Sequence, residues 1–505
     1  MDVLFVNPDS SLTAYQDLAK VYSAIEPPTW SLLLAESCRS KGFGVGILDC
    51  DALRLSLEDS VKQIQDSKAK LIVFVLYGQN PNSGTTSMIG ALKLAEAVKQ
   101  AQIATKICFV GSHVSALPKE VLGYENVDLI LLNEGVYALH SLLSSDLDKD
   151  LKQIRGIGWK DQGVSVLNPP EAIVPQSRMD IDLPGYAWDL LPYDKKPLDL
   201  YRAHFWHAGF DHNERTPFAA IYTSLGCQFA CNFCMINIVN RVDNGDDINA
   251  SHSRGMRFWS PEWVKREMDK LASMGVKTLR ISDEMFFLNR KYYLPVLENC
   301  IENEYGFNMW TYSRIDTVRP NVLETFKKAG VNWLALGVEA GNQTVRQEVS
   351  KGSFKDVNIR DVCSTIQSSG IHIISNYIFG FPEDTVETMG QTLDLALELN
   401  TEMANMYPCQ ALPGSPLYHT SLKNGWDLPS TFEEFAFLSY ECKPMRTNTL
   451  SPVDVLKFRD QAWQKYFTNP AYLELVSKKF GEEQRQNVID MSQIELKRKL
   501  LEVSK

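Results

Sequence analysis

The stretch "GCQFACNFC", residues 226–234, decides the fold because it gathers Cys227, Cys231 and Cys234, three of only ten cysteines in the chain. A structural zinc site needs four ligands, usually as two close pairs. Neither a fourth cysteine nor a Cys-x2-His pair lies nearby in the sequence. Three thiolates on one tight loop instead suit three irons of a [4Fe–4S] cluster, whose fourth iron stays open to a small ligand. Gly226 gives backbone room before the loop, and Phe233 is placed to shield the cluster and pack a planar ligand.

The composition narrows the class of protein. A chain of 505 residues predicts two or three domains. A net charge of −11 argues against a nucleic-acid binder. Neither an 18-residue apolar run nor a basic N-terminal region occurs, so we expect neither a membrane span nor a signal peptide. The other cysteines are scattered, which indicates a reduced, cytoplasmic protein; they are Cys38, Cys50, Cys108, Cys300, Cys363, Cys409 and Cys442.

Residues 1–145 alternate buried-strand patterns with amphipathic helices. The apolar runs at 2–8, 44–49, 70–78, 106–111 and 127–135 predict a parallel, doubly wound, Rossmann-like sheet. Ligands of such sheets bind at the carboxyl ends of the strands. No G-x-G-x-x-G follows the first strand, so an ordinary dinucleotide site is not expected. The candidate binding residues follow the runs and are Asn7, Gly78, Gln79, Asn80, Gly111, Ser112, His113, Glu134 and Gly135.

A second βα series fills residues 216–420, after a Pro- and aromatic-rich linker at 146–215. Its helix-to-strand joints carry Gly275, Gly330 and Gly370, which suit left-handed helix ends. Ser260 and Pro261 predict the start of one helix. The series predicts a partial (β/α)6 barrel of the TIM type, with its chemistry at the carboxyl ends of the strands. Residues 421–505 are expected to form a small helical region that ends in a solvated amphipathic cap.

At this point the sequence resembles a family. Cys-x3-Cys-x2-Cys opening a βα barrel is similar to the radical S-adenosylmethionine (SAM) superfamily. "PPTWSLLLAESCRSKGFGVGILD" and "VGSHVSALPKEVL" resemble the cobalamin-binding domain that precedes the barrel in the cobalamin-dependent branch. "DIDLPGYAWDLLP" resembles its linker, while "YSRIDTVRPNVLETFKKAGVNWLALGVEAG" and "IFGFPEDTVETM" follow its barrel.

The resemblance implies roles around the cluster. Cys227, Cys231 and Cys234 would be its ligands, and SAM would chelate the open iron. Further SAM contacts would come from Phe233, Asp283, Glu284, Arg314, Glu339, Gly380 and Pro382. The acids would meet the ammonium or ribose, Arg314 the carboxylate, and the 380–382 turn the adenine. Two alternatives stay open: Asp283 and Glu284 as solvated loop acids, and Arg314 paired with Asp316 or Glu339. The family often has two aspartates where this sequence has Asp283 and Glu284, and a serine where it has Ala340. These departures weaken the assignment of individual SAM contacts.

For cobalamin, the sequence lacks the Asp-x-His-x-x-Gly motif that supplies a histidine to cobalt. His113 is the one histidine at a strand end of the first domain. We expect it to bond loop or corrinoid amide groups rather than cobalt. The resemblance implies base-off cobalamin between the two carboxyl faces.

The resemblance implies a methyltransferase in which a 5′-deoxyadenosyl radical abstracts hydrogen from a carbon that then receives the methyl group of methylcobalamin; some relatives methylate phosphorus. The alternatives are another radical reaction, such as cyclisation, rearrangement or methylthiolation, and a zinc-stabilised binding module. Methylthiolation would need Cys38, Cys50 and Cys108 as ligands of a second cluster.

The partners implied are a small-molecule substrate and an electron donor of the flavodoxin or ferredoxin type. Substrate contacts are expected from the loop at 235–255, the linker aromatics and the C-terminal region. His204, His207 and His212 have either a substrate or lid role or ordinary linker packing.

Overall fold

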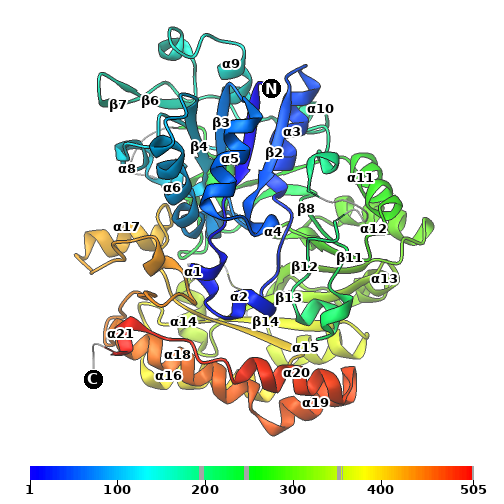
Figure 1. The fold of residues 1–505 in the computed structure, drawn as a ribbon. Helices are drawn as coiled ribbons and strands as arrows, with labels where there is room; N and C mark the ends of the chain where they lie inside the picture. The colour runs from blue at the N-terminus through cyan, green and yellow to red at the C-terminus, as the bar shows by residue number, and fades with distance from the viewer. Residues whose placement is uncertain (193–197, 244–248, 350–353, 355–356, 503–505) are drawn as a thin grey trace.

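The structure is a computed structural model that describes residues 1–192, 198–243, 249–349, 354 and 357–502 (Figure 1). Its N-terminal sheet has the strand order β2-β1-β3-β4-β5-β6-β7. The first five strands in sequence are parallel and confirm the doubly wound prediction. They are β1 (Val3–Asn7), β2 (Val45–Asp49), β3 (Leu71–Leu76), β4 (Lys106–Gly111) and β5 (Leu129–Leu131). Every residue of β3 is buried, because helices cover both faces of the sheet.

The sheet continues beyond the boundary predicted at residue 145. The antiparallel strands β6 (Ile157–Asp161) and β7 (Val164–Leu167) join it as a hairpin, so this part of the predicted linker belongs to the sheet. Gln162 and Gly163 form the two-residue turn with φ angles of 52° and 85°. Two consecutive positive φ angles suit the twist of a tight hairpin.

Helices cover the two faces of this sheet as separate layers. Helices α3 (Thr29–Ser40) and α9 (Val136–Leu143) pack on one face, in the larger hydrophobic core. Helices α5 (Leu57–Ser67) and α6 (Gly84–Gln100) pack on the other face. The short helices α1 (Ser11–Tyr15) and α2 (Leu18–Val21) lie between the N-terminal domain and the second sheet (Figure 1).

The second sheet has six parallel strands in the order β15-β14-β13-β12-β11-β8 and confirms the predicted partial barrel. They are β8 (Phe218–Ile221), β11 (Thr278–Ile281), β12 (Asn308–Arg314), β13 (Val331–Glu339), β14 (His372–Phe379) and β15 (Met403–Pro408). The outer helices include α11 (Pro261–Ser273), α12 (Arg290–Glu302), α13 (Leu323–Lys328), α15 (Ile359–Ser368) and α16 (Val386–Leu399).

The helix boundaries predicted in this domain are confirmed. Ser260 caps α11 by accepting a hydrogen bond from the backbone N–H of Trp263 at 3.1 Å. Gly275, Gly330 and Gly370 have φ angles of 78°, 95° and 76°, in the left-handed region that favours glycine after a helix.

Linker aromatics close the amino end of the half-barrel. The Trp206 ring lies 5.1 Å from Trp310 and 5.3 Å from Trp333, both on barrel strands. His207 is fully buried, and its Nε2 lies 2.9 Å from the carbonyl of Asn308. His204 stacks on Trp206, while His212 stacks on Phe205. These contacts favour the packing alternative for the linker histidines over a substrate or lid role.

The C-terminal helices α18 (Pro452–Phe467), α19 (Pro470–Phe480) and α20 (Glu482–Ser492) pack along the barrel (Figure 1). The hydroxyl of Tyr466 donates to the carbonyl of Thr401 at 2.7 Å, and Phe480 stacks on Trp333 at 5.8 Å. Helix α20 lies in the stretch predicted to be a solvated amphipathic cap, and only Val488, Met491 and Ser492 of this helix are buried. Arg498 is 3% exposed and binds Asp460 and the carbonyl of Ser439.

None of the helices in the described part of the chain combines the length and apolar character that crossing a bilayer requires.

Candidate active site

The cysteine loop lies between two paired strands. Strand β9 (Ser224–Cys227) pairs antiparallel with β10 (Gly255–Phe258) and ends on the first cysteine. Gly226 has a φ of 87°, and a β-carbon there would collide with Asn240 and the carbonyl of Gly255. Only glycine fits this close approach, so the backbone room predicted at residue 226 is real. Cys227, Cys231 and Cys234 are partly exposed, whereas the other seven cysteines are buried.

Backbone amides point at the loop sulfurs. The N–H of Phe229 donates to Cys227 Sγ at 3.4 Å, and the N–H of Ile236 donates to Cys234 Sγ at 3.5 Å. Asn237 fixes the loop, since its Oδ1 accepts from the N–H of Cys227 at 2.8 Å. Such donors stabilise negative sulfur and are typical of thiolates that bind metal.

The electrostatics of the loop also suit a metal cluster. Burial raises the pKa of Cys227 to about 12 and that of Cys231 to about 11. Thiolates in this site therefore need a positive partner, which iron supplies. In the described residues, no three His, Cys, Asp or Glu side chains are grouped around one ion position. Three thiols on one loop suit a cluster in which each binds a different iron.

Asp283, a predicted SAM contact, is engaged within the protein. It is fully buried; its Oδ1 accepts from the N–H of Thr223 at 2.6 Å, and its Oδ2 accepts from the hydroxyls of Thr223 at 2.7 Å and Ser224 at 2.5 Å. Burial raises its pKa to about 6. The carboxylate therefore holds the strand that leads into the cysteine loop, and its burial contradicts the solvated-acid alternative.

Glu284, the next residue, has the opposite character. Its Oε1 is buried and has no hydrogen-bond partner among the described residues. Burial raises the pKa of Glu284 to about 8, although Arg280 lowers it. The side chain lines a cavity between the domains that Trp30 and Tyr77 border from the N-terminal side and Gly226 borders from the barrel. An unpaired carboxylate oxygen in such a cavity fits a cationic ligand such as an ammonium group.

Arg314, at the end of β12, is buried and makes a bidentate pair with Asp316, with distances of 2.6 and 2.7 Å. This is one of the alternatives left open by the sequence. The guanidinium also lies 3.7 Å from the ring centre of Phe229, in the cysteine loop, and lowers the pKa of Cys231. The observed role is therefore to hold positive charge beside the loop.

Glu339 ends β13 in a strained conformation. Its φ is 66°, in a region that non-glycine residues rarely adopt, and the strand register shifts between Gly337 and Glu339. A β-carbon on Gly337 would collide with the Glu339 carboxylate. Burial raises the pKa of Glu339 to about 7, while Arg314 lowers it. Strain that several neighbours maintain is typical of functional sites.

The turn at Gly380 lies against the cysteine loop. The Phe381 ring is 5.8 Å from the Phe233 ring. Gly380 has a φ of 91°, and its N–H and that of Phe381 donate to Asp384, each at 3.0 Å. The carbonyl of Pro382 accepts from the N–H of Asn448 at 2.9 Å. Phe381 thus places the turn of residues 380–382 beside Phe233 of the loop.

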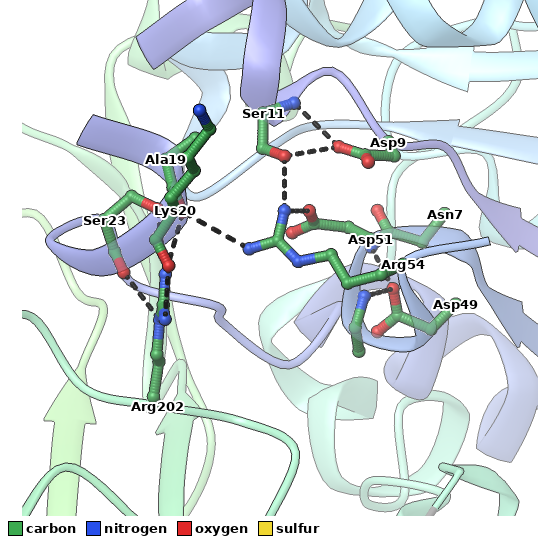
Figure 2. Close-up of polar contacts among 11 residues, drawn as sticks. Asn7, Asp9, Ser11, Ala19, Lys20, Ser23, Asp49, Asp51, Arg54 and Arg202 are labelled. Carbon is green, nitrogen blue, oxygen red and sulfur yellow. Dashed lines mark hydrogen bonds and ion pairs between the residues drawn. The ribbon is translucent and has the colours of Figure 1, made fainter. Parts of the chain in front are cut away.

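On the N-terminal domain, polar side chains gather after β1 and β2 (Figure 2). Asn7 donates to Asp49 at 2.8 Å, so its amide is engaged within the domain. Asp51 lies 3.7 Å from Arg54, which also donates to Ser11. Burial, followed by the charges of Asp49 and Asp9, raises the pKa of Asp51 to about 8.

The ends of β3 and β4 form a backbone-lined surface. Gly78 has a φ of 60°, and a β-carbon on Gly111 would collide with the carbonyl of Leu76. Gln79 is half-buried, and the side chain of Asn80 accepts from the N–H of Asn82 at 2.9 Å. Ser112 is fully buried, and its hydroxyl has no partner among the described residues. Glycines and an unpaired hydroxyl at strand ends fit a large ligand held by backbone and loop groups.

His113 is buried and contacts protein groups through both ring nitrogens. It is 1% exposed; its Nδ1 lies 3.1 Å from the Thr85 hydroxyl and its Nε2 lies 3.4 Å from Glu120. Phe432 packs against its ring at 5.1 Å. Both ring nitrogens are thus engaged by protein groups.

Glu134, a predicted cobalamin contact, is engaged within the protein. It is 2% exposed and pairs with Arg257 of β10 at 2.8 Å, while its other oxygen accepts from the N–H of Val174. Gly135, with a φ of 76°, begins α9 beside it. The pair joins the N-terminal domain to the hairpin that carries the cysteine loop.

Several inward-facing residues of the barrel were missed in the sequence. Asn376 and Asn405 face each other on β14 and β15 with a 3.0 Å hydrogen bond, and Tyr312 and Tyr407 are likewise only partly buried. They occupy alternate positions along their strands, and this two-residue period in the sequence could have identified them.

The family comparisons agree with this architecture. A model of the radical SAM superfamily matches residues 221–396, and a model of the B12 binding domain matches residues 15–143. The fold and the cysteine loop thus define a radical SAM enzyme. The chain belongs to the branch of that superfamily in which a B12-binding domain precedes the barrel.

Relatives align over most of the chain. An uncharacterised methyltransferase of Pyrococcus horikoshii is 23% identical over 94% of each chain. The anaerobic magnesium-protoporphyrin IX monomethyl ester cyclase of Rubrivivax gelatinosus is 24% identical over 94% of this chain and 79% of its own.

Among solved structures, the radical SAM methyltransferase TsrM from Kitasatospora setae, with tryptophan and a SAM analogue bound, matches with a TM-score of 0.66 at 15% identity. The match covers 97% of this chain and 98% of TsrM. OxsB, with aqua-cobalamin and SAM bound, also has a TM-score of 0.66, at 14% identity, over 97% of this chain and 72% of its own. Both confirm the two-domain fold.

Proposed function

We propose that this chain is a cobalamin-dependent radical SAM methyltransferase that acts on a small-molecule intermediate. The observation that carries the proposal is the position of the cysteine loop. It lies at the carboxyl end of the half-barrel, and the loop after β3 of the B12-binding domain bonds to it directly, as the N–H of Met235 donates to Asn82 at 3.0 Å. The TsrM likeness in fold and the methyltransferase relative over 94% of the chain support methyl transfer.

In this proposal Cys227, Cys231 and Cys234 hold a [4Fe–4S] cluster, which together with SAM and cobalamin supplies radical formation and a methyl donor. Glu284 binds the SAM ammonium with its unpaired oxygen. Glu339 accepts from the ribose or the ammonium. Phe233 and the turn at Gly380–Pro382 pack along the adenine.

Other residues support the cysteine loop or the corrinoid and do not contact SAM. Arg314, held by Asp316, places positive charge beside Cys231. Asp283 fixes the entry to the loop through Thr223 and Ser224. The backbone at Gly78, Gln79, Asn80, Gly111 and Ser112 supports the corrinoid, and cobalt receives no histidine from the chain.

A second candidate function is a radical cyclisation or rearrangement, which the cyclase relative favours by its similar identity and coverage. Methylthiolation has less support, although a putative methylthiotransferase of Methanocaldococcus jannaschii is 21% identical over 74% of each chain. Cys38 and Cys108 lie in one hydrophobic cluster and Cys50 in another, so they do not converge on a second cluster site. We further propose a cytoplasmic enzyme that receives electrons from a flavodoxin- or ferredoxin-type donor.

The test is iron and cobalt content after anaerobic reconstitution, followed by reductive SAM cleavage. We expect about four irons and one cobalt per chain. The triple Cys227, Cys231 and Cys234→Ala variant should lose the iron and all 5′-deoxyadenosine formation, whereas Cys300→Ala, a buried thiol outside the site, should retain both. Zinc in place of iron would overturn the proposal. Iron without cobalt would retain the radical SAM chemistry but exclude methylcobalamin as the donor.

A further inference from the structure

Asn82 contacts the cysteine loop from the N-terminal domain with both ends of its side-chain amide. Its Nδ2 donates to Cys234 Sγ at 3.7 Å, and its Oδ1 accepts from the N–H of Met235 at 3.0 Å. The two contacted residues are consecutive, so the amide clamps the loop at its last cysteine.

The position of Asn82 is fixed by its own loop. It lies in the 3-10 turn η1 (Pro81–Ser83), between β3 and α6, and its backbone N–H donates to Asn80 at 2.9 Å. The same loop begins at Gly78, whose φ is 60° and whose β-carbon would lie 2.8 Å from that of Ser83. The turn is thus a compact unit at the carboxyl end of β3, on the surface assigned above to the corrinoid.

An N–H that points at a cluster thiolate stabilises negative charge on the sulfur. The reduced cluster carries one more negative charge than the oxidised cluster, so the hydrogen bond favours the reduced state and raises the reduction potential. Phe229 and Ile236 provide such bonds from within the loop, whereas Asn82 provides one from the other domain.

We propose that Asn82 is a positioning residue through which the B12-binding domain raises the reduction potential of the cluster. This inference rests on the proposed function, because it needs a [4Fe–4S] cluster on Cys227, Cys231 and Cys234. Through Asn82, the loop that supports the corrinoid also sets how readily the cluster accepts the electron that begins the reaction.

Two variants separate the two ends of the amide. Asn82→Ala removes the donor and the acceptor without adding charge. Asn82→Asp keeps an oxygen for the N–H of Met235 but removes the donor to Cys234 and adds a negative charge. The matched control is Asn126→Asp, the same change in the same domain, where the amide donates to the carbonyl of Leu92 at 3.0 Å.

The measurement is the midpoint potential of the cluster in the full-length reconstituted protein, by redox titration with EPR detection. EPR reports only the molecules that hold a cluster, so partial loss of iron does not prevent it. We expect a more negative potential in Asn82→Ala, a larger negative shift in Asn82→Asp, and no shift in Asn126→Asp.

The outcomes separate this inference from the proposed function. If wild-type protein assembles no [4Fe–4S] cluster, the proposed function fails and this inference fails with it. If the cluster forms but Asn82→Ala has the wild-type midpoint potential, the inference alone is overturned. This holds even if the potential of Asn82→Asp shifts, because the added charge would then explain that shift.

Discussion

The carboxylate of Glu339 fills the space in which a side chain on Gly337 would begin. The two residues flank the register shift between β13 and β14, and Glu339 has a φ of 66°. A methyl group two residues away would therefore move the carboxylate proposed to bind SAM without changing any charge.

We expect Gly337→Ala to weaken SAM binding about 10-fold or more, since the loss of one charged hydrogen bond costs roughly 1.5–3 kcal/mol. Glu339→Gln should have a similar effect. Isothermal titration of the reconstituted protein with SAM measures both. The control is Gly390→Ala in α16, where an added β-carbon meets nothing within 4 Å. An unchanged SAM affinity in Gly337→Ala would contradict the role of Glu339.

We expect that His113 does not bind cobalt, because Thr85 and Glu120 engage both of its ring nitrogens. We expect protein loaded with cob(II)inamide, which has no nucleotide base of its own, to give an EPR spectrum without nitrogen splitting. The spectrum of His113→Ala should be the same. A three-line splitting in the wild type that disappears in His113→Ala would show that the histidine does bind cobalt.

The Glu134–Arg257 pair should contribute strongly to stability, since the two side chains are 2% and 9% exposed. Removing one partner leaves a buried charge and costs roughly 3–5 kcal/mol. We expect Glu134→Ala and Arg257→Ala each to lower the denaturation midpoint markedly. Arg360→Ala is the control, because the Arg360–Glu398 pair is 59% and 52% exposed and is worth at most about 1 kcal/mol. Equal effects of the buried and exposed pairs would contradict this account.

Asp51 should make stability depend on pH, because its pKa is raised from 3.8 to about 8. The folded chain keeps a proton that the unfolded chain releases above its ordinary pKa, so Asp51 destabilises the fold increasingly as the pH rises from about 4 to about 8. We expect the stability advantage of Asp51→Asn over wild type to grow across that range and then level off.

Urea denaturation at pH 5, 7 and 9 measures this difference. Asp66→Asn, an exposed change on α5, should differ from wild type by the same amount at each pH. A constant difference for Asp51→Asn would show that Asp51 ionises in the folded chain as it does in the unfolded chain.

Local patterns in the sequence were enough to predict the two sheets and the cysteine loop. Strands such as β3 are apolar throughout because both faces are covered, and glycines such as Gly275 end helices at left-handed φ angles. Both are properties of a few neighbouring residues. The hairpin of β6 and β7 was missed, although the turn at Gln162–Gly163 was readable; the Pro-rich surroundings obscured it.

The roles of the site acids depended on information that is not local. Adjacent residues after a strand point in different directions, so only one of Asp283 and Glu284 faces the cavity, and the strand register decides which. Glu134 meets a partner 123 residues away, which no local pattern indicates. Arg314 and Asp316 are two residues apart, and their pairing was therefore among the alternatives that the sequence offered.

Gln16, between α1 and α2, is held by the far end of the chain. Its Nε2 donates to the carbonyls of Leu438 at 2.7 Å and Lys497 at 3.1 Å, and its Oε1 accepts from the N–H of Lys497 at 3.2 Å. The two bonds to Lys497 can form only after residue 497 has left the ribosome. The segment between the two sheets is therefore fixed by this contact only at the end of synthesis.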